Sequence, residues 1–183
     1  MSSEQHKARS NEGKLLAVGG THVIERGPDC RLESAHPPGA VKDLGWTGML
    51  ALEAVAEGTA TLVCGAEKAI VKFAAPVRLE IDLSDERDPL KLTTMERVRV
   101  RARLFDRFGN ELEVGKFTHF EWTVAEPFKE AVDRSAGEFG YCDTCYGMFS
   151  FRPVKPGTGM IIARLGGLQG ALKIAAAQHW GQI

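Results

Sequence analysis

The stretch that decides the fold runs from residue 97 to residue 124 and reads RVRVRARLFDRFGNELEVGKFTHFEWTV. Apolar side chains alternate with arginines in its first half, which is the period of a β-strand with one buried face. Residues 106–110 predict a turn, because Gly109 and Asn110 tolerate the positive φ angles that tight turns need. Residues 117–124 predict a second strand that ends in Phe120, Trp122 and Val124. The pair of strands indicates a β-sandwich.

The residues around this stretch continue the same pattern. Alternation over 77–83 predicts another strand, and 148–152, 159–165 and 170–176 predict three more. Pro153, Pro156-Gly157 and Gly166-Gly167 separate these last strands, whereas 125–147 predicts a long polar loop with at most one helical turn. Short strands at this spacing, without long amphipathic helices, predict an all-β fold.

The first part of the chain is harder to interpret. Several short apolar runs between 14 and 75 predict strands, and Pro37-Pro38-Gly39 predicts a turn. Residues 49–57, MLALEAVAE, have the composition of either a strand or a short helix. We expect a disordered tail at 1–13, a partial or divergent β unit at 14–75, a β-sandwich at 76–176 and a C-terminal tail at 177–183.

Charge and hydropathy limit the classes of protein. The chain has 183 residues, 23 basic and 24 acidic, so it lacks the basic excess of a nucleic-acid-binding protein. Its polar N-terminus has no apolar signal segment, and no apolar run is long enough to span a bilayer. We expect a soluble chain with no direct membrane insertion. A fragment of a longer secreted or membrane protein is the alternative, so the compartment stays open.

The pattern in 77–176 resembles the immunoglobulin-like (Ig-like) repeats of bacterial invasin and intimin. It also resembles the repeats in the lumenal part of the large nuclear pore membrane glycoprotein. The residues that carry the resemblance are Val98, Val100, Ala102, Leu104, Asp106, Gly109, Asn110, Phe120, Glu121, Trp122 and Val124. The end of the chain, 146–175, is similar to a filamin-type repeat, and 50–73 looks like the closing half of an earlier repeat.

These resemblances imply an Ig-like sandwich with a structural or adhesive role. A nuclear pore type would imply self-association in the nuclear envelope lumen. A filamin type would imply a cytoskeletal setting and a peptide strand added at a sheet edge. In each case, Phe120 and Trp122 are expected to pack between the sheets and to contribute about 2–3 kcal/mol each through burial.

Two cysteines, Cys142 and Cys145, form a C-x-x-C pair in the 125–147 loop. Such a pair is half of a zinc site or a redox pair, but a zinc site needs two further ligands. Cys30 and Cys64 lie in the other half of the chain, and His119 is the nearest histidine. We expect loop cysteines or a local disulfide, with a metal site or a redox pair as the alternatives.

The arginine row, Arg97, Arg99, Arg101 and Arg103, is the candidate protein-binding surface. Period-2 spacing places all four side chains on one face of a strand. The simpler interpretation is a solvated outer face whose arginines pair across strands with Glu111, Glu113 or Glu121. The alternative is a docking surface for an acidic partner.

The remaining polar residues do not indicate a metal site or a catalytic site. Asp82, Asp85, Glu86 and Asp88 resemble the carboxylates that bind Ca²⁺ between Ig-like domains, but no calcium-loop motif is present, so we expect solvated turn residues. The five histidines are scattered and fit no catalytic triad. We therefore expect no enzyme activity and no cofactor.

The predicted function is a non-enzymatic, structural or adhesive Ig-like module, a spacer or protein-binding surface in a larger assembly. Its expected partner is another protein or a second copy of itself. The alternative is a small carbohydrate- or metal-binding accessory domain that uses the 125–147 loop. That loop carries four aromatic residues, namely Phe128, Phe139, Tyr141 and Tyr146.

Overall fold

The computed structural model describes residues 15–24, 29–128 and 145–178. The expected N-terminal tail and most of the expected C-terminal tail lie outside this range. Within it the chain forms fifteen strands and one 3-10 turn, which confirms the all-β prediction. The described residues divide into two compact units. Unit 1 comprises those up to Val77 together with Leu104–Thr118, and unit 2 comprises Arg78–Arg103 together with those from His119 onward.

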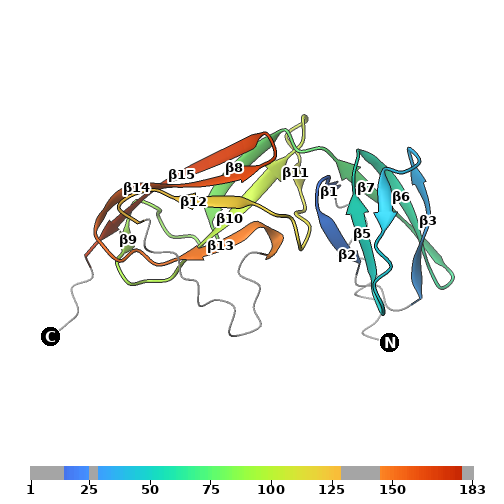
Figure 1. Cartoon of the computed structure of the whole chain (residues 1–183), viewed down its shortest axis with the longest axis horizontal. Coiled ribbons are helices and arrows are strands. Elements are labelled where there is room, and N and C mark those ends of the chain that lie inside the picture. Colours follow the sequence, from blue (N-terminus) through green and yellow to red (C-terminus); the bar gives the residue numbers. More distant parts are fainter. Residues whose placement is uncertain (1–14, 25–28, 129–144, 179–183) are drawn as a thin grey trace. The chain divides into compact units, whose positions relative to one another are not determined.

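Unit 1 is a sandwich of two sheets (Figure 1). One sheet has the order β1-β7-β6-β3, and its strands are β3 (Cys30–His36), β6 (Gly58–Cys64), β7 (Glu67–Ala74) and β1 (Leu15–Ala17). The other has the order β2-β5-β4, with strands β2 (Thr21–Ile24), β5 (Leu50–Ala54) and β4 (Val41–Asp43). All pairs are antiparallel except β1 with β7. The orders β3-β6-β7 and β2-β5-β4 match strands C-F-G and B-E-D of an Ig sandwich.

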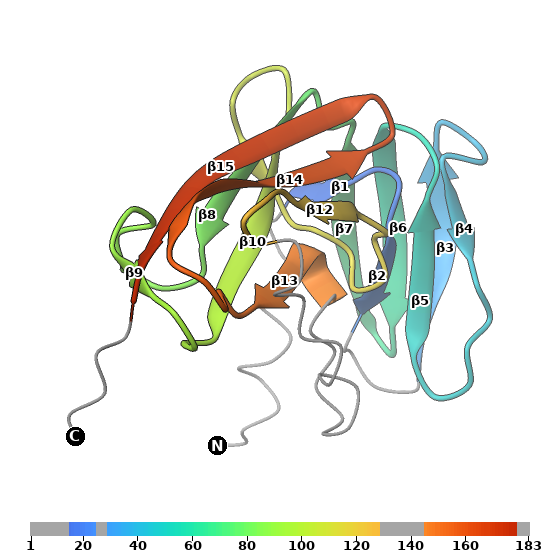
Figure 2. The same ribbon diagram turned by 60° about the vertical axis from the view of Figure 1, so that its left-hand side comes forward.

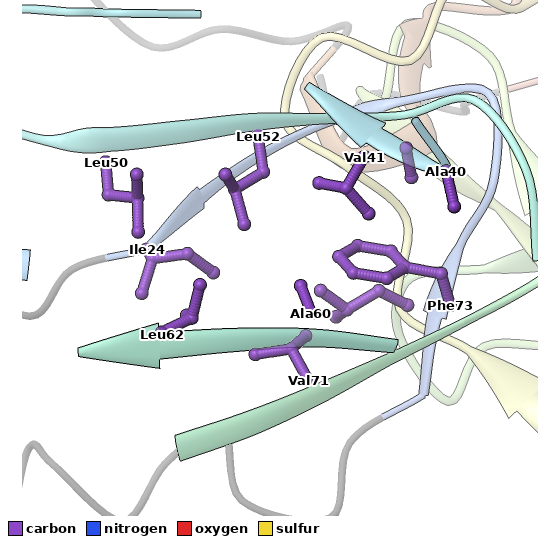
Figure 3. Packing of buried hydrophobic residues seen from close by; sticks show 11 residues of the cluster. Ile24, Ala40, Val41, Leu50, Leu52, Ala60, Leu62, Val71 and Phe73 are labelled. Atoms are coloured by element: carbon purple, nitrogen blue, oxygen red, sulfur yellow. The ribbon is translucent and has the colours of Figure 1, made fainter. Parts of the chain in front are cut away.

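The core of unit 1 fills the space between these sheets. Figure 3 shows Leu50, Leu52 and Val41 from one sheet facing Leu62 and Val71 from the other. Along β7 the buried Ala69, Val71 and Phe73 alternate with exposed side chains, as expected for a strand with one solvent-facing side.

Residues 49–57 do not form a helix. Residues 50–54 are strand β5, which pairs with β2 on one side and with β4 on the other. Because the backbone of β5 is hydrogen-bonded on both edges and Leu50 and Leu52 are buried, tertiary pairing overrides the local helix propensity.

A distant segment of the chain completes unit 1. Strand β11 (Glu111–Leu112) pairs with Leu104 and Phe105. The next residue, Glu113, forms a β-bridge with Leu16: its carbonyl accepts from the Ala17 N–H at 3.0 Å and its N–H donates to the Leu15 carbonyl at 2.8 Å. Gly115 lies so close to Thr21 that an added Cβ would be 2.7 Å from the Thr21 carbonyl oxygen.

Unit 2 is a second sandwich (Figure 2). One sheet places β10 (Val98–Phe105) between β8 (Arg78–Leu83) and β13 (Met148–Phe151). The other has the order β12-β14-β15-β9, with strands β12 (Glu121–Val124), β14 (Gly157–Leu165), β15 (Leu168–Ala177) and β9 (Leu92–Thr93). These orders match strands A-B-E and C-F-G of an Ig sandwich, with β9 added parallel to the last strand.

An aromatic stack occupies the interior of unit 2. Trp122 stacks on Phe149 with ring centroids 5.0 Å apart, Phe149 stacks on Phe151 at 6.4 Å, and Phe120 lies 6.2 Å from Trp122. Val98 and Val100 on β10 are fully buried. Of the expected inner face, Val98, Val100 and Phe120 are buried, whereas Trp122 is only half-buried.

The second predicted strand of that stretch is shorter than expected, because it begins at Glu121 rather than at residue 117. The Thr118 N–H donates to the Gly115 carbonyl, which makes a turn here, and Phe117 is exposed. This turn belongs to unit 1, and the strand that follows belongs to unit 2.

Candidate protein-binding surface

Asp106 organises the turn that ends strand β10. Its Oδ1 accepts from the N–H groups of Phe108 at 2.9 Å and Asn110 at 2.8 Å, and its Oδ2 accepts from the Asn110 side-chain amide at 2.9 Å. Gly109 takes the predicted positive φ of 83°, whereas Asn110 does not take a positive φ. The hydrogen bond from the Asn110 side chain is the main cause that lowers the pKa of Asp106, and backbone N–H donors add to it. These hydrogen bonds therefore stabilise the turn, and Asp106 is a structural residue rather than part of a binding site.

The arginine row lies on the outer face of the β8-β10-β13 sheet. Arg97, Arg99 and Arg101 are exposed and Arg103 is half-buried. Their orientation follows from the strand, because the alternate residues Val98 and Val100 point into the core. Across the ladder from β10, strand β13 places Ser150 opposite Arg99 and Met148 opposite Arg101.

The ion pairs of this face differ from the expected ones. Arg103 bonds to Asp82 of β8, with Nη1 2.8 Å from Oδ2. Glu121, one of the predicted partners, lies in the other sheet, opposite Arg164. Within the described residues, Arg99 and Arg101 form no ion pair.

Asp82, Asp85 and Asp88, three of the four acidic residues of 82–88, are engaged in hydrogen bonds or ion pairs. Asp85 accepts from the Arg87 guanidinium at 2.9 Å, and this bond is the main cause that lowers its pKa. Asp88 accepts from the Leu90 N–H at 2.9 Å, which lowers its pKa in the same way, and lies 3.4 Å from the Lys91 ammonium. Arg87 also reaches Glu96 at 3.3 Å and the Arg97 carbonyl at 3.3 Å. These carboxylates therefore order the loop between β8 and β9.

The cysteines fall into two groups. Cys30 and Cys64 are cross-strand neighbours on β3 and β6 and form a disulfide with an S–S distance of 2.08 Å. It lies within one sheet, unlike the disulfide between strands B and F of antibody domains. Of the predicted C-x-x-C pair, Cys142 lies outside the described residues, and the backbone of Cys145 begins a 3-10 turn that ends at Gly147. In the part of the chain that the structure describes, no three His, Cys, Asp or Glu side chains are grouped to hold a metal ion.

The aromatic residues of the 125–147 loop are not equivalent. Phe128 is completely buried against Gly159, so it belongs to the core of unit 2 and cannot contact a ligand. Tyr146 is 47% exposed and adopts a left-handed conformation with φ 56°. Phe139 and Tyr141 lie outside the described residues.

One exposed aromatic pair is not predicted by the sequence patterns. In unit 1, Trp46 and Phe117 meet edge to face with centroids 5.5 Å apart and are 38% and 51% exposed. The Lys116 ammonium lies 5.6 Å from the centre of the Phe117 ring. Gly45 and Gly48, on either side of Trp46 and Thr47, both take positive φ, which indicates a loop with a defined backbone conformation at 44–49. That glycine pattern was the available signal, but the proximity of Phe117 depends on the tertiary fold.

Comparisons with known proteins give structural similarity only. No protein-family model matches this chain, and no curated protein is similar to it in sequence. Domains 4–9 of the surface layer protein SbsC align at 13% identity and a TM-score of 0.39, over 92% of this chain and 30% of that one. The Escherichia coli adhesin FdeC aligns at 12% and 0.35, over 88% of this chain and 60% of that one. The titin Ig tandem A164–A165 aligns at 9% identity and a TM-score of 0.35, over 93% of this chain and 95% of that one.

Both units are Ig-like β-sandwiches, and this assignment rests on their strand order and pairing. That order does not distinguish the invasin/intimin, nuclear pore and filamin types. No helix in the described residues is long and apolar enough to cross a membrane.

Proposed function

We propose that the chain is a non-enzymatic structural module that binds another protein through the outer face of the β8-β10-β13 sheet. The observation that carries the proposal is the contrast along β10. Arg103 is neutralised by Asp82, whereas Arg99 and Arg101 project into solvent with no carboxylate partner among the described residues. Ig-like sandwiches suit this role, because a rigid sheet holds such side chains at fixed positions.

The experiment is charge reversal at the surface. Arg99→Glu with Arg101→Glu should abolish capture of the physiological partner in a pull-down from the native source. Because both side chains are exposed, the melting temperature should change little. The matched control is Lys173→Glu, which reverses an exposed charge on the other sheet and should retain capture. If the double variant captures its partner as well as the unmodified chain does, this surface is not the binding site.

Within the Ig-like fold, we propose the invasin/intimin type as the finer assignment. The support is the position of the residues that carry the resemblance. Val98, Val100, Ala102 and Leu104 are all buried, and Asp106, Gly109 and Asn110 form the turn. This type would give the module an adhesive role.

A further inference from the structure

Two arginines of β10, Arg99 and Arg101, have no ion-pair partner among the described residues and lie at a defined spacing. Arg99 and Arg101 are two residues apart on one strand, so their Cα atoms are separated by about 6.7 Å along the strand direction. Their outward direction is imposed by the fully buried Val98 and Val100.

The strip of positive charge is narrow. On one side, β13 places the buried Ser150 and the half-buried Met148 opposite the two arginines, and both residues are neutral. On the other side, β8 has Leu79 and Ile81 buried, which turns Glu80 and Asp82 to the outer face. Both acids already pair, Glu80 with Arg78 and Asp82 with Arg103. The positive strip is therefore about one strand wide, or about 4.8 Å.

We propose that this strip binds an extended acidic segment of a protein partner, with carboxylates at positions i and i+2 on Arg99 and Arg101. An extended peptide repeats its side chains on one face every two residues, so its carboxylates have the same spacing as the arginines. Each guanidinium can then form a bidentate pair with one carboxylate. The inference rests on the proposed function, since it names the partner of that surface.

The surroundings favour a single peptide strand over a nucleic acid. A duplex would extend beyond a strip of this width and meet the carboxylates of β8. The chain also carries a net charge of −1, so it lacks the broad basic field that draws polyanions.

The test uses the full chain and labelled synthetic peptides, with binding followed by fluorescence anisotropy at low salt. One peptide is rich in β-branched residues and carries Asp at i and i+2, and a second of identical composition carries them at i and i+1. We expect the first to bind at least about fivefold more tightly, and its affinity to fall as salt is raised. Arg99→Gln and Arg101→Gln should each weaken it about tenfold, whereas Lys173→Gln should have no effect.

Two results overturn the inference. The first is equal affinity for both peptides, or no binding of either, with the folded state checked by melting temperature. The second is tighter binding of a sulfated glycan or an oligonucleotide that the same arginine variants abolish. In either case, loss of partner capture on charge reversal would still support the surface itself, so the two proposals fail separately.

Discussion

His22 is a titratable side chain in the interior of unit 1. Only 4% of it is exposed, its Nε2 donates to the Ala17 carbonyl at 2.8 Å, and its ring meets the edge of Phe73 with centroids 5.8 Å apart. Burial lowers its pKa below 6.5, and the Ala17 carbonyl and Glu113 only partly oppose this shift. The neutral ring is therefore the form that the folded unit accommodates.

This environment predicts a dependence of stability on pH. Because the folded pKa is below the unfolded value of 6.5, the unfolded chain binds more protons in the window below 6.5. The contribution of His22 to stability is full above pH 6.5 and is lost as the pH falls through the folded pKa. Urea unfolding from about pH 7.5 to about pH 5 should show a shallower loss of stability for His22→Gln than for the parent chain. The control His119→Gln, at an exposed position, should keep the parent slope.

Asp106 predicts a second effect at the scale of one residue. Asp106→Ala removes the acceptor of two backbone N–H groups and of the Asn110 amide, so the melting temperature at neutral pH should fall. Asp106→Asn keeps one acceptor oxygen, so its melting temperature should fall less than that of Asp106→Ala. The pKa of Asp106 is lowered, so the advantage of Asp over Asn is present above pH 3.8 and lost as the pH falls through the folded value. Equal melting temperatures for Asp106→Ala and the parent chain would contradict this account of the turn.

Among the elements, β15 and β8 approach closely at a glycine. An added Cβ on Gly170 would lie 2.9 Å from the Leu79 carbonyl oxygen, and it would also collide with the Leu79 side chain. Gly170→Ala should therefore destabilise the protein by roughly 1–3 kcal/mol in chemical denaturation. Gly167 gives the matched control, because an added Cβ there meets nothing within 4 Å. Gly167→Ala should leave stability unchanged or raise it by about 0.4–1 kcal/mol.

The disulfide predicts the behaviour of strands β3 and β6. It closes a loop with a sequence separation of 34 residues, for which the chain-entropy estimate is roughly 3–4 kcal/mol. Cys30→Ser with Cys64→Ser should lower the free energy of unfolding by about this amount. A reductant in the buffer should lower the free energy of unfolding of the parent chain by breaking this disulfide. The double variant, which lacks the disulfide, should not show that loss. A parent chain with two free thiols at these positions, found by alkylation and peptide mapping, would refute the pairing.

At the scale of the whole molecule, residues far apart in sequence stabilise one unit. Because Gly115 lies against the Thr21 backbone, Gly115→Ala should displace the 113–118 segment and destabilise unit 1 by roughly 1–3 kcal/mol. The Ala17 amide, which donates to the Glu113 carbonyl, should then exchange faster with deuterium. The same Gly167→Ala control should leave the exchange of Ala17 unchanged.

Local patterns predicted the strands with clean alternation and missed the others. Strand β10 was evident because each inner residue is apolar and each outer one is arginine. Strand β3 was missed because it is an edge strand with a register shift between Leu32 and Ser34, which breaks its alternation. The two-residue strand β9 is too short to show any period.

The candidate site was predictable in part for the same reason. Alternation alone places the arginines of β10 outward. The choice of Asp82 as the partner of Arg103 depends on β8 being the neighbouring strand, which is a property of the topology. The exposed pair of Trp46 and Phe117 likewise joins two loops that no local pattern connects.

Unit 1 is built from two segments that are separated in the sequence, and this affects when it can fold during synthesis. Strand β1 is near the beginning of the chain, yet its last backbone partner, Glu113, emerges only after strand β8 and most of strand β10, which belong to unit 2, have been made. Unit 1 therefore cannot be completed until Arg78–Arg103 of unit 2 have been made. Until residues 104–118 arrive, one edge of β1 stays open, and a nascent chain halted near Val77 would carry that open edge.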